Sequence, residues 1–352
     1  MTESFAALCA GLIAGWALTL LSIRLALRLD VRDRPGHRSS HSVPTPRLGG
    51  LGIALPMQLL YIVLFVFWSP RLSLAAQTCL SAAVMGGFLS FFLGLADDLK
   101  GMGAVMKLAG QAFCALTAVL AGLRIHSLGM GGGFALTPLL GGAAAFCWIM
   151  LLMNALNFMD GMNGKLGTFA AVVALGLGFM GRGIIPPGMV MIFPALTGVC
   201  LGFLVFNLTP AQTFMGDSGS QYLGYLAGIM TLYLHNEAPA SQPFWGFVIL
   251  LLPFLFDVIF TLVRRILHGE NILRAHRSHL YQRLLIAGWS HPQVLRLTFA
   301  TYAICCGLAA GFQRIGSTSV KAALGVCAMG VMAGYAWFVR RVEKRSAEQV
   351  NR

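Results

Sequence analysis

Two asparagines and an aspartate follow an apolar run near the middle of the chain at three-residue spacing: Asn154, Asn157 and Asp160. On a helix such positions spread over about a third of the circumference, so their oxygen atoms gather on one face. Gly161 and Gly164 loosen the backbone beside them. Carboxylate and amide oxygens suit a hard cation such as Mg²⁺. The pattern predicts either such a cation site or an ordinary polar helix end at a membrane surface.

Two adjacent carboxylates, Asp97 and Asp98, close another apolar run. Neighbouring helical residues point about 100° apart, so the two acids can serve different purposes. Acids are disfavoured at a helix C-terminus, and adjacent carboxylates disfavour each other's ionisation unless a cation lies nearby. These costs favour a functional pair over a solvated helix end. Lys107 and Gln111, one turn apart at the start of the next apolar run, are placed to reach the same polar pocket.

Asp217 precedes an expected helix in the stretch 214–220, where Gly216 and Gly219 permit close approach. The free N–H groups of a helix start form an anion site. An acid that binds Mg²⁺ beside such amides would hold a diphosphate and its metal together. The alternative is an ordinary N-cap aspartate. Asn207, at the end of the preceding apolar run, is expected to support this site.

The stretch 276–284 lies in the longest polar loop and combines imidazole, guanidinium and hydroxyl groups. Its polar members are His276, Arg277, Ser278, His279, Tyr281, Gln282 and Arg283. Such a group can neutralise charge that develops during phosphoryl transfer, whereas a basic loop against lipid headgroups is the alternative. The same choice applies to the stretch 32–50, which contains Arg38 and His41. Asp257 stands inside an apolar run and is expected at a helix contact or cavity, because a lipid-facing carboxylate would be costly; a catalytic role is the minor alternative.

The elements that must position these residues are membrane helices. The chain has 352 residues, of which 57% are hydrophobic and 11% charged, and its mean hydropathy is +0.76. The expected fold is an all-α polytopic membrane protein with about eleven transmembrane helices (ten or eleven) in a single integral domain, 1–352. The expected spans are 5–27, 48–69, 73–96, 103–122, 133–153, 165–181, 186–206, 219–235, 243–266, 293–313 and 319–340.

Charge asymmetry orients these spans. Nineteen of the 25 Lys and Arg residues fall on the side of the segments 28–47, 97–107, 154–165 and 264–296 and of the tail from 340, against five on the other side. The positive-inside rule makes the first side cytoplasmic. All the candidate residues lie on that side, and the net charge of +13 therefore needs no nucleic acid to explain it. The first span is expected to be retained, and the eight cysteines, all in apolar runs, are expected to be buried thiols.

These stretches, in this order, resemble the polyprenyl-phosphate N-acetylhexosamine-1-phosphate transferase family. The matching stretches extend from Arg34 to Arg283. The resemblance implies a cytoplasmic Mg²⁺ (or Mn²⁺) site and the transfer of an amino-sugar-1-phosphate from a UDP-sugar to a polyprenyl phosphate, with release of UMP. It carries over onto the acids Asp97 and Asp98, the N-x-x-N-x-x-D-G stretch, Asp217 and His279. On this basis Asp217 and Asp160 are expected to bind the metal, with catalytic roles for Asp97, Asp98, Asp160 and His279; Asp98 is expected to align or deprotonate the lipid phosphate.

The remaining candidates are expected to bind substrate. They are Arg38, His41, Lys107, Asn154, Asn157, Asn207, His276, Arg277, Ser278 and Arg283. The expected partners are a UDP-activated amino sugar, a polyprenyl phosphate and the lipid bilayer of the bacterial inner membrane, without nucleic acid; a homodimer stays open.

The chain departs from the family pattern in three places. Asn163 stands where many relatives carry a second Asp, and Lys165 replaces a usual apolar residue. His276, Tyr281 and Gln282 replace the Asp and paired histidines of the common C-terminal motif. The stretch 276–284 instead resembles the branch that starts O-antigen chains with 6-deoxy sugars such as N-acetylfucosamine or N-acetylquinovosamine. A phospho-N-acetylmuramoyl-pentapeptide transferase is an alternative. A secondary transporter is the alternative of another class, but a transporter would place its polar residues near the midplane on interrupted helices.

Overall fold

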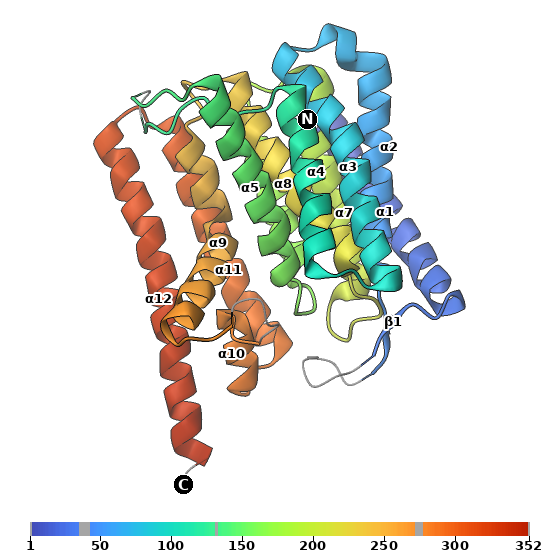
Figure 1. Ribbon diagram of the computed structural model, residues 1–352, viewed down its shortest axis with the longest axis vertical. Helices are drawn as coiled ribbons and strands as arrows, with labels where there is room; N and C mark the ends of the chain where they lie inside the picture. Colours follow the sequence, from blue (N-terminus) through green and yellow to red (C-terminus); the bar gives the residue numbers. More distant parts are fainter. Residues whose placement is uncertain (1, 35–42, 131–132, 272–276, 351–352) are drawn as a thin grey trace.

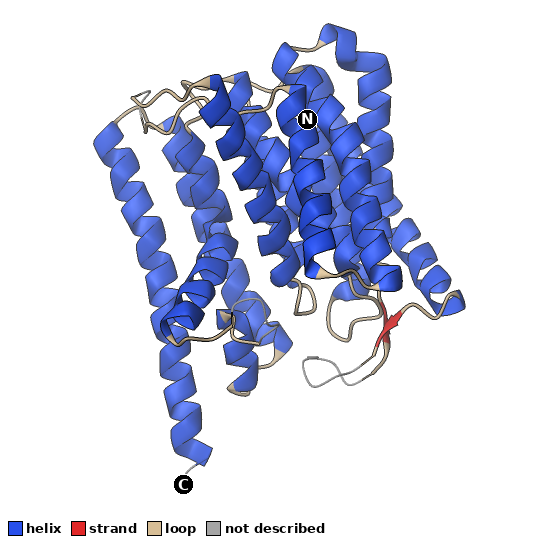
Figure 2. Ribbon diagram, viewed as in Figure 1, coloured by secondary structure: helices blue, strands red, loops and turns tan. Residues whose placement is uncertain are grey.

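The computed structural model describes residues 2–34, 43–130, 133–271 and 277–350, and these residues fold almost entirely into helices (Figure 2). The helices are α1 (Thr2–Arg28), α2 (Leu51–Trp68), α3 (Leu74–Lys100), α4 (Ala104–Ala121), α5 (Pro138–Phe158), α6 (Lys165–Met180), α7 (Ile192–Asn207), α8 (Gly216–Glu237), α9 (Phe244–Leu267), α10 (Leu280–Ile286), α11 (His291–Arg314) and α12 (Thr318–Val350). Two-residue strands, β1 (Arg32–Asp33) and β2 (Thr45–Pro46), form a small antiparallel hairpin. The expected all-α class is confirmed.

In the described part of the chain, nine helical segments are long and apolar enough to cross a membrane. Two further helices coincide with expected spans without meeting both criteria. One is α6, which is apolar but only 16 residues long. The other is α8, which has 22 residues but carries many polar ones. Every expected span therefore corresponds to a helix, and the protein is a multi-pass membrane protein.

The long helices run side by side as a bundle, with the N-terminus at one end and the C-terminus at the other (Figure 1). The end that contains the C-terminus also contains the hairpin and α10. Helix α8 passes through the middle, packed against α3 and α5, and every residue from Gly216 to His235 is buried. A helix that meets only protein can tolerate polar residues that would be costly against lipid.

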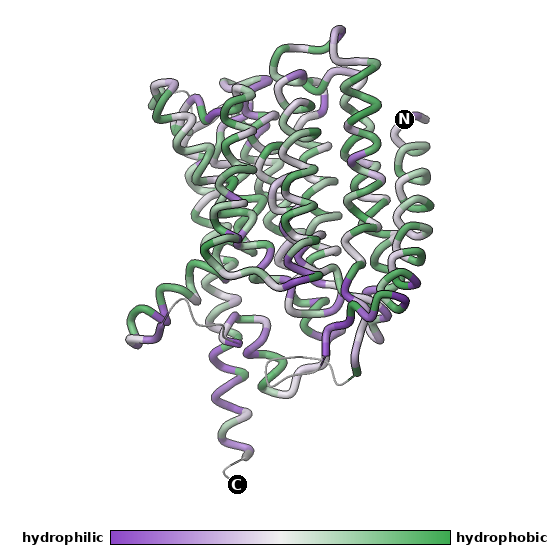
Figure 3. The backbone as a smooth tube through the Cα atoms, turned by 45° about the vertical axis from the view of Figure 1, so that its right-hand side comes forward, coloured by the Kyte–Doolittle hydropathy of each residue, from purple (hydrophilic) through white to green (hydrophobic). Residues whose placement is uncertain are grey.

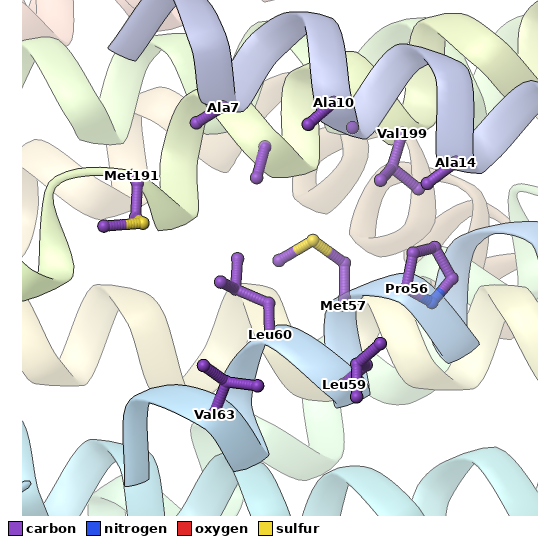
Figure 4. A pocket seen from close by; sticks show the side chains of 12 residues that line it. Ala7, Ala10, Ala14, Pro56, Met57, Leu59, Leu60, Val63, Met191 and Val199 are labelled. Atoms are coloured by element: carbon purple, nitrogen blue, oxygen red, sulfur yellow. The ribbon is translucent and has the colours of Figure 1, made fainter. Parts of the chain in front are cut away.

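Close backbone contact joins the first helix to the seventh. A Cβ atom on Gly198 of α7 would lie 2.1 Å from the carbonyl oxygen of Leu8 in α1, so only glycine fits there. Helix α2 packs against both helices and leaves an apolar crevice of about 340 Å³ between the three, lined for example by Ala10, Met57 and Val199 (Figure 4). Because its lining is apolar, this crevice cannot accommodate a charged nucleotide.

The boundaries of α5 differ from the expected ones at both ends. The sequence predicted a span over 133–153, whereas the helix begins at Pro138 and continues to Phe158. Thr137 caps its start by accepting a hydrogen bond from the Leu140 N–H, and proline suits the first helical position. Asn154 and Asn157 therefore both lie at the C-terminal end of the helix.

Polar residues concentrate at the end of the bundle that contains the hairpin. The tube coloured by hydropathy is largely green along the helices and purple at this end and along the extension of α12 beyond the bundle (Figure 3). This distribution agrees with the expectation that the candidate residues share one side of the membrane.

Candidate active site

The hairpin brings an arginine to the start of α8. The Phe214 N–H donates to the Pro46 carbonyl at 2.8 Å, and the Gly49 N–H donates to the Phe214 carbonyl at 2.9 Å. Segment 46–50 is thereby held along the residues that precede α8. Arg47 lies in this segment, and its guanidinium reaches the two carboxylates at the neighbouring helix ends.

Asp217 is the centre of the charged cluster. Its Oδ1 lies 2.8 Å from Nη2 of Arg47, and its Oδ2 is paired with Nζ of Lys107. The same Nζ lies 2.8 Å from Oδ2 of Asp97, whose Oδ1 accepts the Met102 N–H. The expected convergence of Lys107 on the pocket of the two adjacent acids is therefore present. Two cations and several carboxylates from four separate segments meet at one point.

Asp98 has a different environment from its neighbour. Its side chain is fully buried, and it accepts the N–H groups of Asp217 at 2.8 Å and of Ser218 at 2.9 Å, together with Nε of Arg47 at 3.0 Å. Gly216 makes this contact possible, because its φ is +72° and a Cβ atom would lie 2.6 Å from the Asp98 carboxylate. Asp98 thus caps α8.

This contact bears on two expectations about the site. The first N–H groups of α8 were expected to bind substrate phosphate, but two of them are already satisfied by Asp98. Asp98 was expected to align or deprotonate the lipid phosphate, but its oxygens face backbone donors and Arg47 and not a free surface. Sequence reasoning missed this role because it depends on the meeting of α3 and α8, which are far apart in the chain.

The amides of α5 face the polar side of α8, as their spacing predicted. Nδ2 of Asn154 donates to Oε1 of Gln111 at 2.8 Å, and Nδ2 of Asn157 donates to Oγ of Ser220 at 2.9 Å. Gln111 in turn contacts Gln221 of α8 at 3.4 Å. These bonds link α4, α5 and α8 behind the charged cluster.

Asp160 lies in the turn after α5, between the charged cluster and the loop that precedes α10. Burial raises the pKa of its carboxyl to about 7, and the negative charges of Asp217 and Asp98 act in the same direction. Arg47 on one side and Lys165 on the other oppose this shift. Asp160 is therefore a carboxylate that gains from an additional cation.

A second group surrounds the expected catalytic histidine. His279 is 4% exposed, and its Nδ1 lies 3.2 Å from Oδ1 of Asp257, which also accepts the Leu280 N–H at 2.9 Å. The carboxylate thus fixes both the imidazole and the start of α10. Asp257 was expected at a helix contact or cavity and was not included among the site residues. Its partner could not be found from spacing, because 22 residues separate the two in the sequence.

Two residues that were expected to bind substrate form hydrogen bonds or ion pairs with other residues of the protein. Asn207 accepts the Gly164 N–H and donates to the Thr213 carbonyl, both at 2.8 Å, and therefore ties two loops together. Arg283 is buried and forms a two-point ion pair with Glu343 on the extension of α12. Both residues support the site and do not face it.

The other members of the two basic stretches differ in what the structure shows of them. Arg277 and Ser278 are partly exposed before α10. Arg38, His41 and His276 lie outside the described residues. Arg47 is the residue of the first stretch that reaches the cluster, and the charge count alone did not single it out.

The donor set fits a hard divalent cation. No group of three His, Cys, Asp or Glu side chains within the described residues is arranged as a ready-made metal site. Mg²⁺, however, is commonly held by one or two carboxylates, with water and substrate phosphates completing its shell. Asp217 and Asp160 supply such carboxylates, and the pairing of Asp217 with Arg47 and Lys107 shows that this position already attracts positive charge. A metal ion would compete with these side chains for Asp217.

Comparison with known proteins identifies the family. The family model described as glycosyl transferase family 4 matches residues 80–235, which include the adjacent acids, the α5 amides and Asp217. A decaprenyl-phosphate N-acetylglucosaminephosphotransferase of Mycolicibacterium smegmatis is 31% identical over 304 residues, covering 78% of this chain and 73% of the relative. The chain belongs to glycosyl transferase family 4. The resemblance to polyprenyl-phosphate hexosamine-1-phosphate transferases is thereby confirmed.

Other relatives of this family 4 protein carry related names. A Bacillus subtilis protein named "Probable undecaprenyl-phosphate N-acetylglucosaminyl 1-phosphate transferase" is 30% identical over 78% of this chain and 75% of its own length. A phospho-N-acetylmuramoyl-pentapeptide-transferase of Picosynechococcus sp. is 28% identical over 86% of this chain and 82% of its own length. The two sets differ in the sugar that their names specify.

Proposed function

We propose that this protein transfers an N-acetylated amino-sugar-1-phosphate from a UDP-sugar to undecaprenyl phosphate and releases UMP. The observation that carries the proposal is the position of Asp217, at the start of a buried helix and flanked by Arg47, Lys107 and Asp97. A cluster of carboxylates and cations suits a diphosphate with its metal ion. Its position at one end of a membrane bundle suits an acceptor whose tail lies in lipid while its phosphate meets a soluble nucleotide.

Asp217 and Asp160 would hold Mg²⁺ or Mn²⁺, which when bound would neutralise the diphosphate and favour departure of UMP. Arg47 and Lys107 now pair with Asp217. With a cation bound at this carboxylate, Arg47 and Lys107 would be available to bind the donor phosphates. His279, with Arg277 and Ser278 beside it, would contact the same phosphates from the loop that precedes α10.

Asp97 is better placed than Asp98 to align the attacking lipid phosphate. The Asp97 side chain retains some exposure, whereas that of Asp98 is fully buried. Lys107 bridges Asp97 and Asp217 and so connects the expected acceptor position to the expected metal position. The attacking oxygen of the lipid phosphate would form a bond to the sugar-bearing phosphorus as the bond to UMP breaks.

We further propose that the active site faces the cytoplasm of the bacterial inner membrane and that the product starts a surface glycan of the O-antigen type. The excess of Lys and Arg on the side of the site supports the orientation. The resemblance of stretch 276–284 to the branch that uses 6-deoxy amino sugars supports the glycan. The alternative product is the muramoyl-pentapeptide lipid named for the Picosynechococcus relative.

A donor panel tests these proposals. Purified protein is incubated with undecaprenyl phosphate, Mg²⁺ and one donor at a time: UDP-N-acetylglucosamine, a UDP-6-deoxy-N-acetylhexosamine or UDP-N-acetylmuramoyl-pentapeptide. The expected result is UMP release and a lipid-linked sugar with an N-acetylhexosamine donor, abolished by EDTA and by Asp217→Asn. Turnover of the muramoyl-pentapeptide donor alone would establish the alternative. EDTA-resistant turnover would reject the metal assignment.

A further inference from the structure

A buried lysine lies between the charged cluster and α10. Lys165, the first residue of α6, is 1% exposed. Its Nζ lies 3.9 Å from the centroid of the Tyr281 ring and 4.4 Å from that of the Phe254 ring. Among the described residues, its Nζ donates a hydrogen bond to Sδ of Met159 at 3.7 Å. The ammonium is thus held by two aromatic faces and a sulfur atom instead of an oxygen.

Such an arrangement is costly unless the surrounding residues compensate for it. A buried ammonium loses its hydration, and a thioether is a weak acceptor. The negative faces of two desolvated rings replace part of that hydration. The carboxylates of Asp257 and Asp160 add electrostatic attraction. Lys165 therefore connects the turn that contains Asp160 with α9, whose Asp257 fixes His279.

Tyr281 is the contact through which this connection reaches the site. The residue is fully buried, and a Cβ atom on Gly161 would lie 2.3 Å from its hydroxyl oxygen. The ring therefore packs directly behind the turn that contains Asp160. On its other side it lies nearly parallel to the imidazole of His279, at a centroid distance of 6.1 Å and an interplanar angle of 14°.

We propose that Lys165 and Tyr281 act as a matched pair that positions His279 and α10 against the Asp160–Gly161 turn. This inference rests on the proposed function, because it assumes that His279 and Asp160 serve one reaction. The pair also accounts for two of the departures from the family pattern together. A lysine ammonium requires a neutral, electron-rich ring beside it, whereas a histidine at position 281 would offer a poorer face and would repel the lysine when protonated.

Burial also decides between two interpretations of Tyr281. A residue at this position beside His279 could either select the sugar or pack the loop. A side chain that is fully enclosed by Gly161, Lys165 and His279 does not meet the sugar. The pair should therefore affect turnover of all accepted donors by the same factor and leave the ratio of kcat/KM between donors unchanged.

A double-mutant cycle tests the pair. The variants are Lys165→Met, Tyr281→His and their combination, each assayed for kcat and KM with two donors and for the midpoint of thermal unfolding. Tyr281→His alone should lower kcat roughly tenfold to thirtyfold, the scale of a lost desolvated cation–π contact. In the Lys165→Met background the same substitution should cost less than threefold. Lys165→Met alone should lower kcat without lowering the midpoint, because it removes a buried charge.

Two controls make the outcome specific. Tyr281→Phe retains the ring face and should lose far less activity than Tyr281→His. Tyr61→His alters another fully buried tyrosine, which lies in α2. Its effect should be the same whether residue 165 is lysine or methionine.

Equal losses from Tyr281→His in both backgrounds would overturn the proposal, as would full kcat in Lys165→Met. If the wild-type protein turns over none of the donors, the proposed function fails, and the cycle is then evaluated from the thermal midpoints. In that case, non-additive shifts of the midpoint would support the contact between residues 165 and 281, although the reaction would be rejected. Additive shifts would reject the matched pair as well.

Discussion

The cap on α8 gives a sharp prediction for Asp98→Asn. Asp98 accepts hydrogen bonds from the N–H groups of Asp217 and Ser218 and from Nε of Arg47. An asparagine retains one acceptor oxygen and places an NH₂ group against a donor, so at least one buried N–H loses its partner. Such a loss costs about 1–3 kcal/mol. The lost charge at the helix N-terminus adds up to about 2 kcal/mol in a buried setting.

The expected total is thus about 1–5 kcal/mol, which in a chain of this size corresponds to a shift of roughly 1–7 °C in the midpoint of thermal unfolding. The assay is thermal unfolding of purified protein in detergent, with UMP release measured on the same samples. Asp97→Asn is the matched control, because Asp97 is the neighbouring acid and receives one backbone N–H, that of Met102. It should shift the midpoint by less than half as much while lowering kcat strongly. An unchanged midpoint in Asp98→Asn, with activity lost, would refute the cap and return Asp98 to a direct role in catalysis.

Three further predictions concern the supports of the site and its orientation. Glu343→Gln should destabilise the protein by about 1–3 kcal/mol because buried Arg283 loses its charged partner. Thermal unfolding measures this effect, and the same substitution in an Arg283→Met background should have little effect. Asn207→Ala should cost about 1–3 kcal/mol through two lost backbone bonds, and an unchanged midpoint would contradict the loop contact. In a cysteine-free background, Asp33→Cys and His268→Cys should react with a membrane-impermeant maleimide only from the cytoplasmic side; labelling from outside would invert the topology.

Local periodicity predicted the parts of this structure that depend on one helix. The spacing of Asn154 and Asn157 predicted a shared face, and both amides do face the α4 and α8 side. Hydropathy likewise located the helices, although it ended α5 five residues early. It did so because polar residues continue a helix when protein, and not lipid or water, surrounds them.

Contacts between distant segments could not be predicted from the sequence. Arg47 reaches Asp217 across 170 residues, through a hairpin whose pairing leaves no marked hydropathy pattern. Asn207 and Arg283 were expected to bind substrate. In the structure, Asn207 hydrogen-bonds to the protein backbone and Arg283 pairs with Glu343, and only folding brings these partners close. The grouping of the polar residues at one end of the bundle could be predicted. Whether a residue binds a ligand or supports the site depended on which donors and acceptors were already satisfied.

The enclosure of α8 has a consequence for how the protein is made. Its 22 residues include Asp217, Ser218, Ser220 and Gln221 and are not apolar enough to qualify as an independent span. Such a segment partitions poorly from the translocon into lipid by itself. Its principal neighbours, α3 and α5, precede it in the chain and are synthesised first. The nascent protein can thus present a partly assembled scaffold to α8. We therefore expect the helix that bears the central carboxylate to enter the membrane by docking onto earlier helices.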